Sequence, residues 1–248
     1  MIVFVTGVTS GFGAAITRRF IAAGAKVVGS GRRADRLAVL QAELGGNLLT
    51  RTLDVRDRAA VERCVAELPP EFAEVDVLIN NAGLARGLEP AQRADLDDWE
   101  AMVDTNIKGL MYCTRAFLPG MVARDHGHIV NLGSVAGEFP YPGGNAYGGT
   151  KAFVRQFSLN LRADLLGSKV RVTNIEPGMA ETEFSVVRFG GDAARAGSVY
   201  AGTQPLSAED IAETVEWVVS RPAHVNVNTM SIMPVCQAFS PFAVKRQD

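Results

Sequence analysis

The stretch Thr6-Gly7-Val8-Thr9-Ser10-Gly11-Phe12-Gly13 follows an apolar run at residues 2–5 and leads into an amphipathic segment. A strand, a glycine turn and a helix in this order begin a βαβ unit. Glycines let the backbone turn tightly and approach a pyrophosphate, and a helix N-terminus offers free N–H donors to an anion. The spacing is TGxxxGxG rather than GxGxxG, and a plain glycine-rich turn would also contain these glycines. The residues that we expect at a dinucleotide site are Gly7, Thr9, Ser10, Gly11, Phe12 and Gly13.

The rhythm of this first unit continues along the chain, because short β-branched runs alternate with amphipathic stretches. The expected strands cover residues 2–6, 26–30, 48–53, 75–80, 128–132, 170–175 and 229–233. The expected helices cover residues 13–23, 34–44, 58–68, 97–123, 146–166 and 208–220. Several strands are continuously apolar, as in parallel sheets covered on both faces. The pattern predicts an α/β fold of Rossmann type, in which a doubly wound parallel sheet is flanked by helices.

No composition shift marks a second domain, so we expect residues 1–248 to form a single dinucleotide-binding and catalytic domain. One region, from Pro177 to Pro205, is rich in glycine and lacks a clean period. A connection of this length in a compact domain is usually functional or poorly ordered. Because the irregular region is this long, we predict a substrate lid at about 179–205.

The composition is that of a globular protein, with 47% hydrophobic and 21% charged residues and a net charge of -2. This balance gives no general attraction to nucleic acid or to anionic membranes, so small molecules and further copies of the chain are the expected partners. Cys64, Cys113 and Cys236 are widely spaced and form no CxxC pair, so neither a disulfide framework nor a metal site is expected. No signal peptide and no membrane span are predicted. We expect a cytoplasmic protein.

Two arginines follow the second expected strand, as Ser30-Gly31-Arg32-Arg33. A site selective for NAD places an Asp or Glu there, about 20 residues after the glycine turn, on the ribose 2′-hydroxyl. Arg32 and Arg33 could instead hold a 2′-phosphate through charge-assisted hydrogen bonds. The other interpretation is a solvated basic helix start, since Asp35 and Arg36 follow closely. We expect NADP (NADPH) to be the cofactor.

Tyr147 and Lys151 lie four residues apart in an expected helix, so they share one face. Lowering a tyrosine pKa by about 3 units takes about 4 kcal/mol, which an ammonium about 4 Å away supplies at an effective dielectric of about 20. Ser134 follows the strand at 128–132, where open α/β sheets gather their ligands. A core tyrosine beside a solvated lysine would have the same spacing. With Ser134 nearby, the pattern indicates acid/base chemistry at a substrate oxygen.

With these residues assembled, the chain resembles the short-chain dehydrogenase/reductase family over nearly its whole length. The matching motifs are Thr6-Gly7-x-x-x-Gly11-x-Gly13, Asp54-Val55, Asn80-Asn81-Ala82-Gly83, Asn106, Ser134, Tyr147-x-x-x-Lys151 and Pro177-Gly178. The resemblance implies an oxidoreductase that transfers hydride between a nicotinamide cofactor and a hydroxyl or carbonyl carbon.

The resemblance also implies a role for each matching position. Tyr147 would be the general acid/base, Ser134 would polarise the substrate oxygen, Lys151 would lower the tyrosine pKa and hold the nicotinamide ribose, and Asn106 would position a water in a proton relay. The implied cofactor contacts are Asp54 and Val55 beside the adenine, Asn81, Ala82 and Gly83 near the adenosine ribose, and Pro177, Gly178 and Thr182 around the nicotinamide.

Within that family, the chain is similar to the NADP-dependent 3-hydroxy acid dehydrogenases that act on serine, allo-threonine and related short acids. The supporting stretches are residues 16–20, 145–158, 171–178 and 222–226. An acid substrate presents a carboxylate, which a buried site would bind with an arginine. Arg188, in the expected lid, is the candidate. It could equally be a surface arginine of a mobile loop.

Two other functions stay open at this point. A broad NADPH-dependent carbonyl reductase of neutral ketones or aldehydes would need no carboxylate clamp. A non-catalytic dinucleotide-binding regulator would usually lack the acid/base, and here Ser134, Tyr147 and Lys151 are all present. The resemblance further implies a homotetramer, formed through the helices at 97–123 and 146–166 and through the apolar tail at 229–244.

Overall fold

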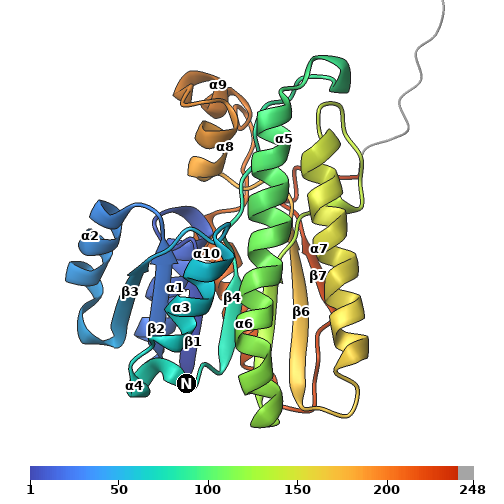
Figure 1. The fold of residues 1–248 in the computed structure, drawn as a ribbon. Coiled ribbons are helices and arrows are strands. Elements are labelled where there is room, and N and C mark those ends of the chain that lie inside the picture. Colours follow the sequence, from blue (N-terminus) through green and yellow to red (C-terminus); the bar gives the residue numbers. More distant parts are fainter. Residues whose placement is uncertain (240–248) are drawn as a thin grey trace, which may run out of the picture.

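The computed structural model describes residues 1–239, and the end of the apolar tail lies outside these residues. Its strands are β1 (Ile2–Thr6), β2 (Lys26–Gly31), β3 (Leu48–Thr52), β4 (Val77–Asn80), β5 (Gly127–Leu132), β6 (Val170–Pro177) and β7 (Thr229–Ile232). They form one sheet of order β3-β2-β1-β4-β5-β6-β7 in which every paired strand is parallel. The predicted doubly wound sheet is confirmed, and each of the seven expected strands is present (Figure 1).

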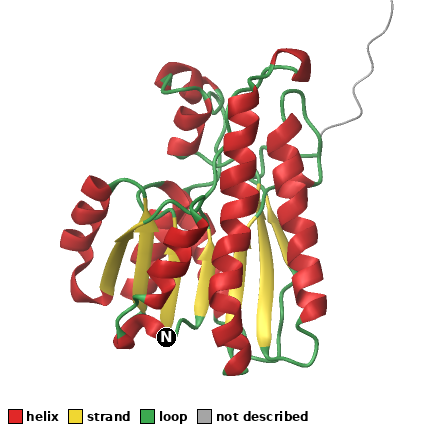
Figure 2. Ribbon diagram, in the orientation of Figure 1, coloured by secondary structure: helices red, strands yellow, loops and turns green. Residues whose placement is uncertain are grey.

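Helices cover both faces of this sheet (Figure 2). They are α1 (Gly11–Ala22), α2 (Ala34–Leu44), α3 (Arg58–Ala66), α4 (Pro70–Ala73), α5 (Leu96–Val103), α6 (Leu110–Ala123), α7 (Asn145–Asp164), α8 (Glu183–Arg188), α9 (Ala193–Ser198) and α10 (Ala208–Val219). Three short 3-10 turns are η1 (Gly45–Asn47), η2 (Ala91–Arg93) and η4 (Val135–Gly137), and η3 (Asp104–Gly109) is π-helical.

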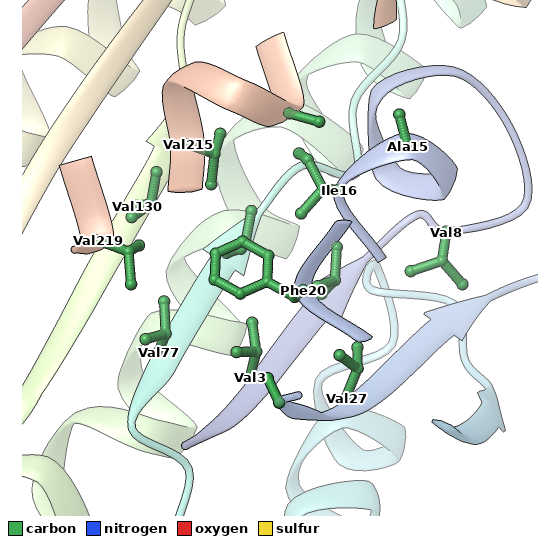
Figure 3. Close-up of a cluster of buried hydrophobic side chains, with 14 of the residues drawn as sticks. Val3, Val8, Ala15, Ile16, Phe20, Val27, Val77, Val130, Val215 and Val219 are labelled. Atoms are coloured by element: carbon green, nitrogen blue, oxygen red, sulfur yellow. The ribbon is translucent and has the colours of Figure 1, made fainter. Parts of the chain in front are cut away.

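The hydrophobic core has two layers, one on each side of the sheet. Side chains alternate between the faces of a strand, so Val3 and Val5 of β1 enter one layer and Phe4 enters the other. The first layer packs α1, α2 and α10 against the sheet, with Phe20 and Val215 at its centre (Figure 3). The second layer packs α3, α4, α6 and α7. Both faces are apolar because both are covered, as the continuous apolar runs predicted.

One expected helix and one region predicted to be irregular differ from their predictions. The stretch predicted as one helix at 97–123 consists of α5, the π-helical turn η3 and α6, because a wide turn interrupts the α-helical hydrogen bonding around Asn106. The region predicted to be irregular contains the six-residue helices α8 and α9, which lie beyond the carboxyl edge of the sheet (Figure 1). Helices this short carry too few turns to show a period in the sequence.

No helix among residues 1–239 is both long enough and apolar enough to cross a membrane.

Candidate active site

A cavity of about 590 Å³ lies at the carboxyl edge of the sheet. The strand order reverses between β1 and β4, and ligands of open α/β sheets bind at such a switch point. The sequence-predicted residues that line the cavity are Gly7, Thr9, Ser10, Gly11, Phe12, Arg32, Arg33, Asp54, Val55, Asn81, Ala82, Gly83, Ser134, Tyr147, Lys151, Pro177, Gly178, Thr182 and Arg188. Segments far apart in the sequence therefore meet at one site.

Two predicted residues, Gly13 and Asn106, do not line the cavity but support its wall. A β-carbon added at Gly13 would lie 2.2 Å from the Gly7 carbonyl oxygen, so only glycine lets α1 approach the turn. The Asn106 side chain is buried, accepts a hydrogen bond from the Leu84 amide at 2.9 Å and donates to the Leu84 carbonyl at 2.8 Å. Both residues fix the backbone around the site.

The glycine turn carries features that suit an anion. Gly7 and Gly11 have positive φ values of 75° and 51°, which glycine adopts without strain. The Ser10 side chain forms no capping hydrogen bond to α1, so the first amides of this helix are not satisfied by a side-chain cap. Asn81 braces the turn, because its Nδ2 donates to the carbonyl oxygens of Thr6 at 2.8 Å and Gly7 at 3.1 Å. These features match the predicted pyrophosphate cradle.

The predicted phosphate-binding arginines differ in their contacts. Arg32 is exposed at the cavity rim. Arg33 donates to the Thr9 hydroxyl at 2.8 Å and to the Ser10 hydroxyl at 2.9 Å, and it forms an ion pair with Glu183 of α8 at 3.2 Å. The Arg33 guanidinium therefore joins the glycine turn to the opposite side of the cavity.

Tyr147 and Lys151 lie on α7, and Ser134 follows β5. The Lys151 ammonium donates to the Leu132 carbonyl at 2.7 Å and lies 5.8 Å from the centre of the Tyr147 ring. Ser134 Oγ accepts from the Ala136 amide at 3.1 Å and donates to the Pro177 carbonyl at 3.4 Å. Backbone groups at the ends of neighbouring strands thus hold Ser134 and Lys151 in place.

The pKa of Tyr147 in the protein alone differs from the sequence expectation. Desolvation raises the pKa of Tyr147 to about 12, although a hydrogen bond with Ser134 and the charge of Arg188 oppose this rise. Desolvation also lowers the pKa of Lys151 to about 8. The expectation that Lys151 brings the tyrosine pKa toward neutrality is not met in the protein alone, because desolvation outweighs the lowering by Ser134 and Arg188.

Arg188, at the end of α8, lies inside the cavity rather than on the surface of a loop. Its guanidinium carbon is 5.1 Å from the centre of the Tyr147 ring, and one terminal nitrogen donates to the Tyr141 hydroxyl at 2.9 Å. Its Nε is buried and has no hydrogen-bond partner among the described residues. A buried donor without a partner is costly, so this nitrogen favours an acceptor supplied by a ligand.

Several cavity residues near Tyr147 were not predicted from the sequence. They are Phe139, Tyr141, Phe184, Tyr200, Met233, Gln237 and Phe239. Gln237 Oε1 accepts from the Met179 amide at 2.7 Å, and the rings of Phe139 and Phe239 lie 4.2 Å apart. They come from loops, from the segment predicted as a lid and from the segment after β7, where no motif or period marks them. Only their position near the predicted lid could have suggested them.

Among residues 1–239, no group of three or more His, Cys, Asp or Glu side chains is arranged to hold a metal ion.

Comparison with known proteins gives consistent matches. The profile of the short chain dehydrogenase family matches residues 1–189. The NADP-dependent 3-hydroxy acid dehydrogenase YdfG of Escherichia coli strain K12 is 60% identical over 248 residues, which is 100% of both chains. The serine 3-dehydrogenase of Agrobacterium fabrum is 52% identical over 245 residues, 99% of this chain and 98% of that protein. The solved closed form of a serine dehydrogenase complexed with NADP+ is 60% identical, with a TM-score of 0.99 and 100% of both chains covered.

Proposed function

The chain belongs to the short chain dehydrogenase family, and from this premise we propose that it is an NADP-dependent oxidoreductase of small 3-hydroxy acids such as serine or allo-threonine. Hydride passes between the cofactor and the hydroxyl or carbonyl carbon of the substrate. The observation that carries the choice of an acid substrate is Arg188, whose guanidinium lies over Tyr147 with a buried Nε that lacks a protein acceptor. A substrate carboxylate is the acceptor that this donor fits best.

The residues that hold the cofactor are proposed from their positions along the cavity. The free amides at the start of α1 and the glycine turn suit the pyrophosphate, and Arg32 and Arg33 suit the 2′-phosphate. Asp54 and Val55 line the adenine end, while Pro177, Gly178 and Thr182 line the nicotinamide end. The chemistry that the cofactor supplies when bound is hydride transfer at its nicotinamide ring.

Tyr147 acts on the proton of the substrate oxygen. Because its pKa of about 12 lies far above neutrality, the phenol is protonated in the protein alone and can donate its proton to an oxygen that gains charge. In the oxidation direction Tyr147 must first lose that proton, which positive charge near the ring favours. The Lys151 ammonium nitrogen lies 5.8 Å from the ring centre, and the Arg188 guanidinium carbon lies 5.1 Å from it.

Ser134 and Arg188 orient the substrate. Ser134 and Tyr147 both line the cavity and Ser134 lowers the pKa of Tyr147, so the two hydroxyls can share one substrate oxygen. Arg188 binds the carboxylate at the other end of a short acid, and two anchored ends leave a small molecule little freedom to rotate. Asn106 remains a proposed water-positioning residue, held by Leu84 and Thr150.

A broad carbonyl reductase of neutral ketones or aldehydes remains the second candidate. The observation that favours it is the set of aromatic side chains that line the cavity, Phe139, Phe184 and Phe239, of which Phe184 lies 5.7 Å from the Tyr147 ring. Apolar side chains of this size would also accept a substrate without a charge.

We further propose that residues 1–248 form one catalytic domain whose segment at about 179–205 is a substrate lid, the range in which α8 and α9 lie. A homotetramer in the cytoplasm is proposed as well. Apolar side chains exposed on α5 and α7, Leu96 and Leu159 among them, support contacts between copies through this pair of helices.

The test is turnover of the purified protein with NADP, followed through the reduced cofactor. The substrates are L-serine, short 3-hydroxy acids and neutral alcohols, and Tyr147→Phe is the control. We expect turnover that is selective for acids and that falls at least about a hundredfold in Tyr147→Phe, because general acid/base catalysis is worth that much.

Activity on neutral alcohols alone would instead support the carbonyl reductase. Cofactor binding without any turnover would refute the assignment as an enzyme.

A further inference from the structure

Helix α8 has its two ends at two different parts of the cavity. At its first residue, the Glu183 carboxylate forms ion pairs with Arg36 at 2.6 Å and with Arg33 at 3.2 Å. At its last residue, the Arg188 guanidinium lies 5.1 Å from the Tyr147 ring centre. One six-residue helix therefore connects the arginines after β2 with the residue proposed as the acid/base.

Packing and backbone bonds hold α8 at a few points, since the Phe184 ring lies 5.7 Å from the Tyr147 ring and the Gly87 amide donates to the Arg188 carbonyl at 3.1 Å. Ser185 is its only buried residue, and Val187 is exposed. Isolated helices of this length are unstable in water, so contacts with the rest of the protein must set its orientation. Thr182 caps it, with Oγ1 accepting from the Phe184 amide at 3.2 Å, but this bond is internal to the lid.

The ion pairs of Glu183 supply an external attachment. Arg36 Nη1 donates to both carboxylate oxygens, at 2.6 Å and 2.9 Å. Arg33 is itself fixed by the hydroxyls of Thr9 and Ser10 in the glycine turn. Although desolvation raises the pKa of Glu183, hydrogen bonds from Arg36 and Arg33 lower it below the ordinary value, so the carboxylate is charged at neutral pH.

The charges of this group of arginines and Glu183 still balance when a dianionic 2′-phosphate binds. Arg32 forms no ion pair among residues 1–239, so it is free to bind phosphate together with Arg33. Arg36 does not line the cavity and keeps Glu183. Three arginines then face one carboxylate and one phosphate, so binding the cofactor does not require the lid to lose its anchor.

We propose that Glu183 is a positioning residue that anchors helix α8 to Arg33 and Arg36 and thereby holds Arg188 over Tyr147. The inference rests on the proposed function, in which Arg188 binds the substrate carboxylate. Glu183 touches neither substrate nor Tyr147 and acts only through the helix that it starts.

The test compares Glu183→Gln, which removes the charge and keeps the shape, with Glu181→Gln. Glu181 lies two residues earlier in the same lid, is exposed, and its side chain forms no bond among the described residues. We expect Glu183→Gln to raise KM for 3-hydroxy acids about fivefold, the effect of losing a small ion-pair network. We expect kcat to change less than about twofold, since the reacting residues stay in place. Arg36→Gln should give the same result, and the double variant should be no worse than either single one.

The pH dependence of kcat/KM distinguishes a positioning role of Glu183 from a general loss of stability in the segment around α8. The polar and charged groups facing Tyr147 are Ser134, Tyr141, Lys151 and Arg188, and Arg188 lowers the tyrosine pKa. If Arg188 moves away, that pKa rises further. The limb of kcat/KM for oxidation that depends on Tyr147 should then shift to higher pH in Glu183→Gln and stay unchanged in Glu181→Gln.

Hydrogen exchange of the backbone amides at 183–188, with and without NADP, gives a readout that needs no turnover. Faster exchange in Glu183→Gln and Arg36→Gln, but not in Glu181→Gln, supports the anchor. If the wild type turns over no hydroxy acid, the proposed substrate fails, and this exchange pattern still supports the anchor. Unchanged exchange overturns it, as does a raised KM for NADP with an unchanged KM for the acid.

Discussion

The glycine turn at residues 7–13 and the segment at residues 179–205, proposed as a lid, both line the cavity, but they are held by different means. The turn is fixed by close backbone packing, with the Asn81 side chain bracing it, since a β-carbon at Gly13 would lie 2.2 Å from the Gly7 carbonyl oxygen. In the lid, a β-carbon at Gly190, Gly191, Gly197 or Gly202 would meet nothing within 4 Å. Backbone hydrogen bonds attach this segment at few points, among them Gly87 to Arg188 at 3.1 Å, and side chains supply the rest through Glu183 and through the hydrogen bond of Arg188 to Tyr141.

Because of this difference, the cofactor and the substrate would be bound by regions of different rigidity. Backbone that is packed tightly has one geometry, which suits a cofactor that is the same in every turnover. A segment held by a few polar side chains has a lower local stability and can open for a substrate to enter. The strongest test of the comparison is therefore to disturb each region with the same chemical change.

The largest effect is expected from Gly13→Ala. The added methyl has no space, and forcing α1 away from the turn should cost about 3 kcal/mol or more. Thermal unfolding should show a clear fall in Tm, together with the loss of cofactor binding. The matched change is Gly197→Ala in α9, which has open space and lies inside a helix. We expect that variant to be neutral or up to about 1 kcal/mol more stable. Equal losses of Tm in the two variants would contradict the comparison.

Replacing Arg32 and Arg33 together by Ala is expected to have the next largest effect. Losing two charge-assisted contacts to a phosphate should weaken NADP binding about a hundredfold. The Kd of NAD, which has no 2′-phosphate, should rise less than about fivefold. Titration of both cofactors measures this, and Arg58→Ala serves as a control because Arg58 is exposed and pairs only with Glu62 outside the cavity. A similar loss for both cofactors would refute the assignment of a phosphate site.

Arg188→Ala in the lid is expected to have a smaller and more selective effect. KM for 3-hydroxy acids should rise about thirtyfold, because one charge-assisted hydrogen bond is worth about 2 kcal/mol. Turnover of neutral alcohols should change less than about threefold, since they make no such bond. The control is Arg195→Ala, whose guanidinium packs 4.5 Å from the Phe189 ring in the same lid and does not line the cavity. An unchanged KM for 3-hydroxy acids would show that Arg188 does not bind the substrate carboxylate.

The same contrast explains how far the fold could be predicted from the sequence. The sheet was predictable because strands covered on both faces are continuously apolar, and α2 was predicted with its observed bounds, 34–44. The short helices α4, α8 and α9 were not, because four to six residues show no period. The π-helical turn was missed because no local residue pattern distinguishes it from an α-helix.

The candidate site divides in the same way. Residues that act through a local pattern, such as the glycine turn and the Tyr147 and Lys151 pair, were predictable and lie together around the cavity. Tyr141, Phe184 and Gln237 were not, because they reach the cavity through tertiary packing. The direction of the tyrosine pKa shift was wrong for the same reason, since the sequence does not show how strongly the phenol is desolvated.

The π-helical turn η3 also constrains how the protein can vary. It places one extra residue in a turn between α5 and α6, and each residue of an α-helix rotates the chain by about 100°. The wide turn takes up the extra residue, so deleting one residue from 104–109 would restore regular α-helix without turning α5 by that angle relative to α6. Met102 would then keep its place in the core it shares with Leu84 and Ala85, but Asn106, which lies within the turn, would lose its bonds to Leu84. The length of this segment should therefore matter for the position of Asn106 beside the cavity and not for the packing of α5 and α6, whereas the open glycines at 190–202 leave room for insertion.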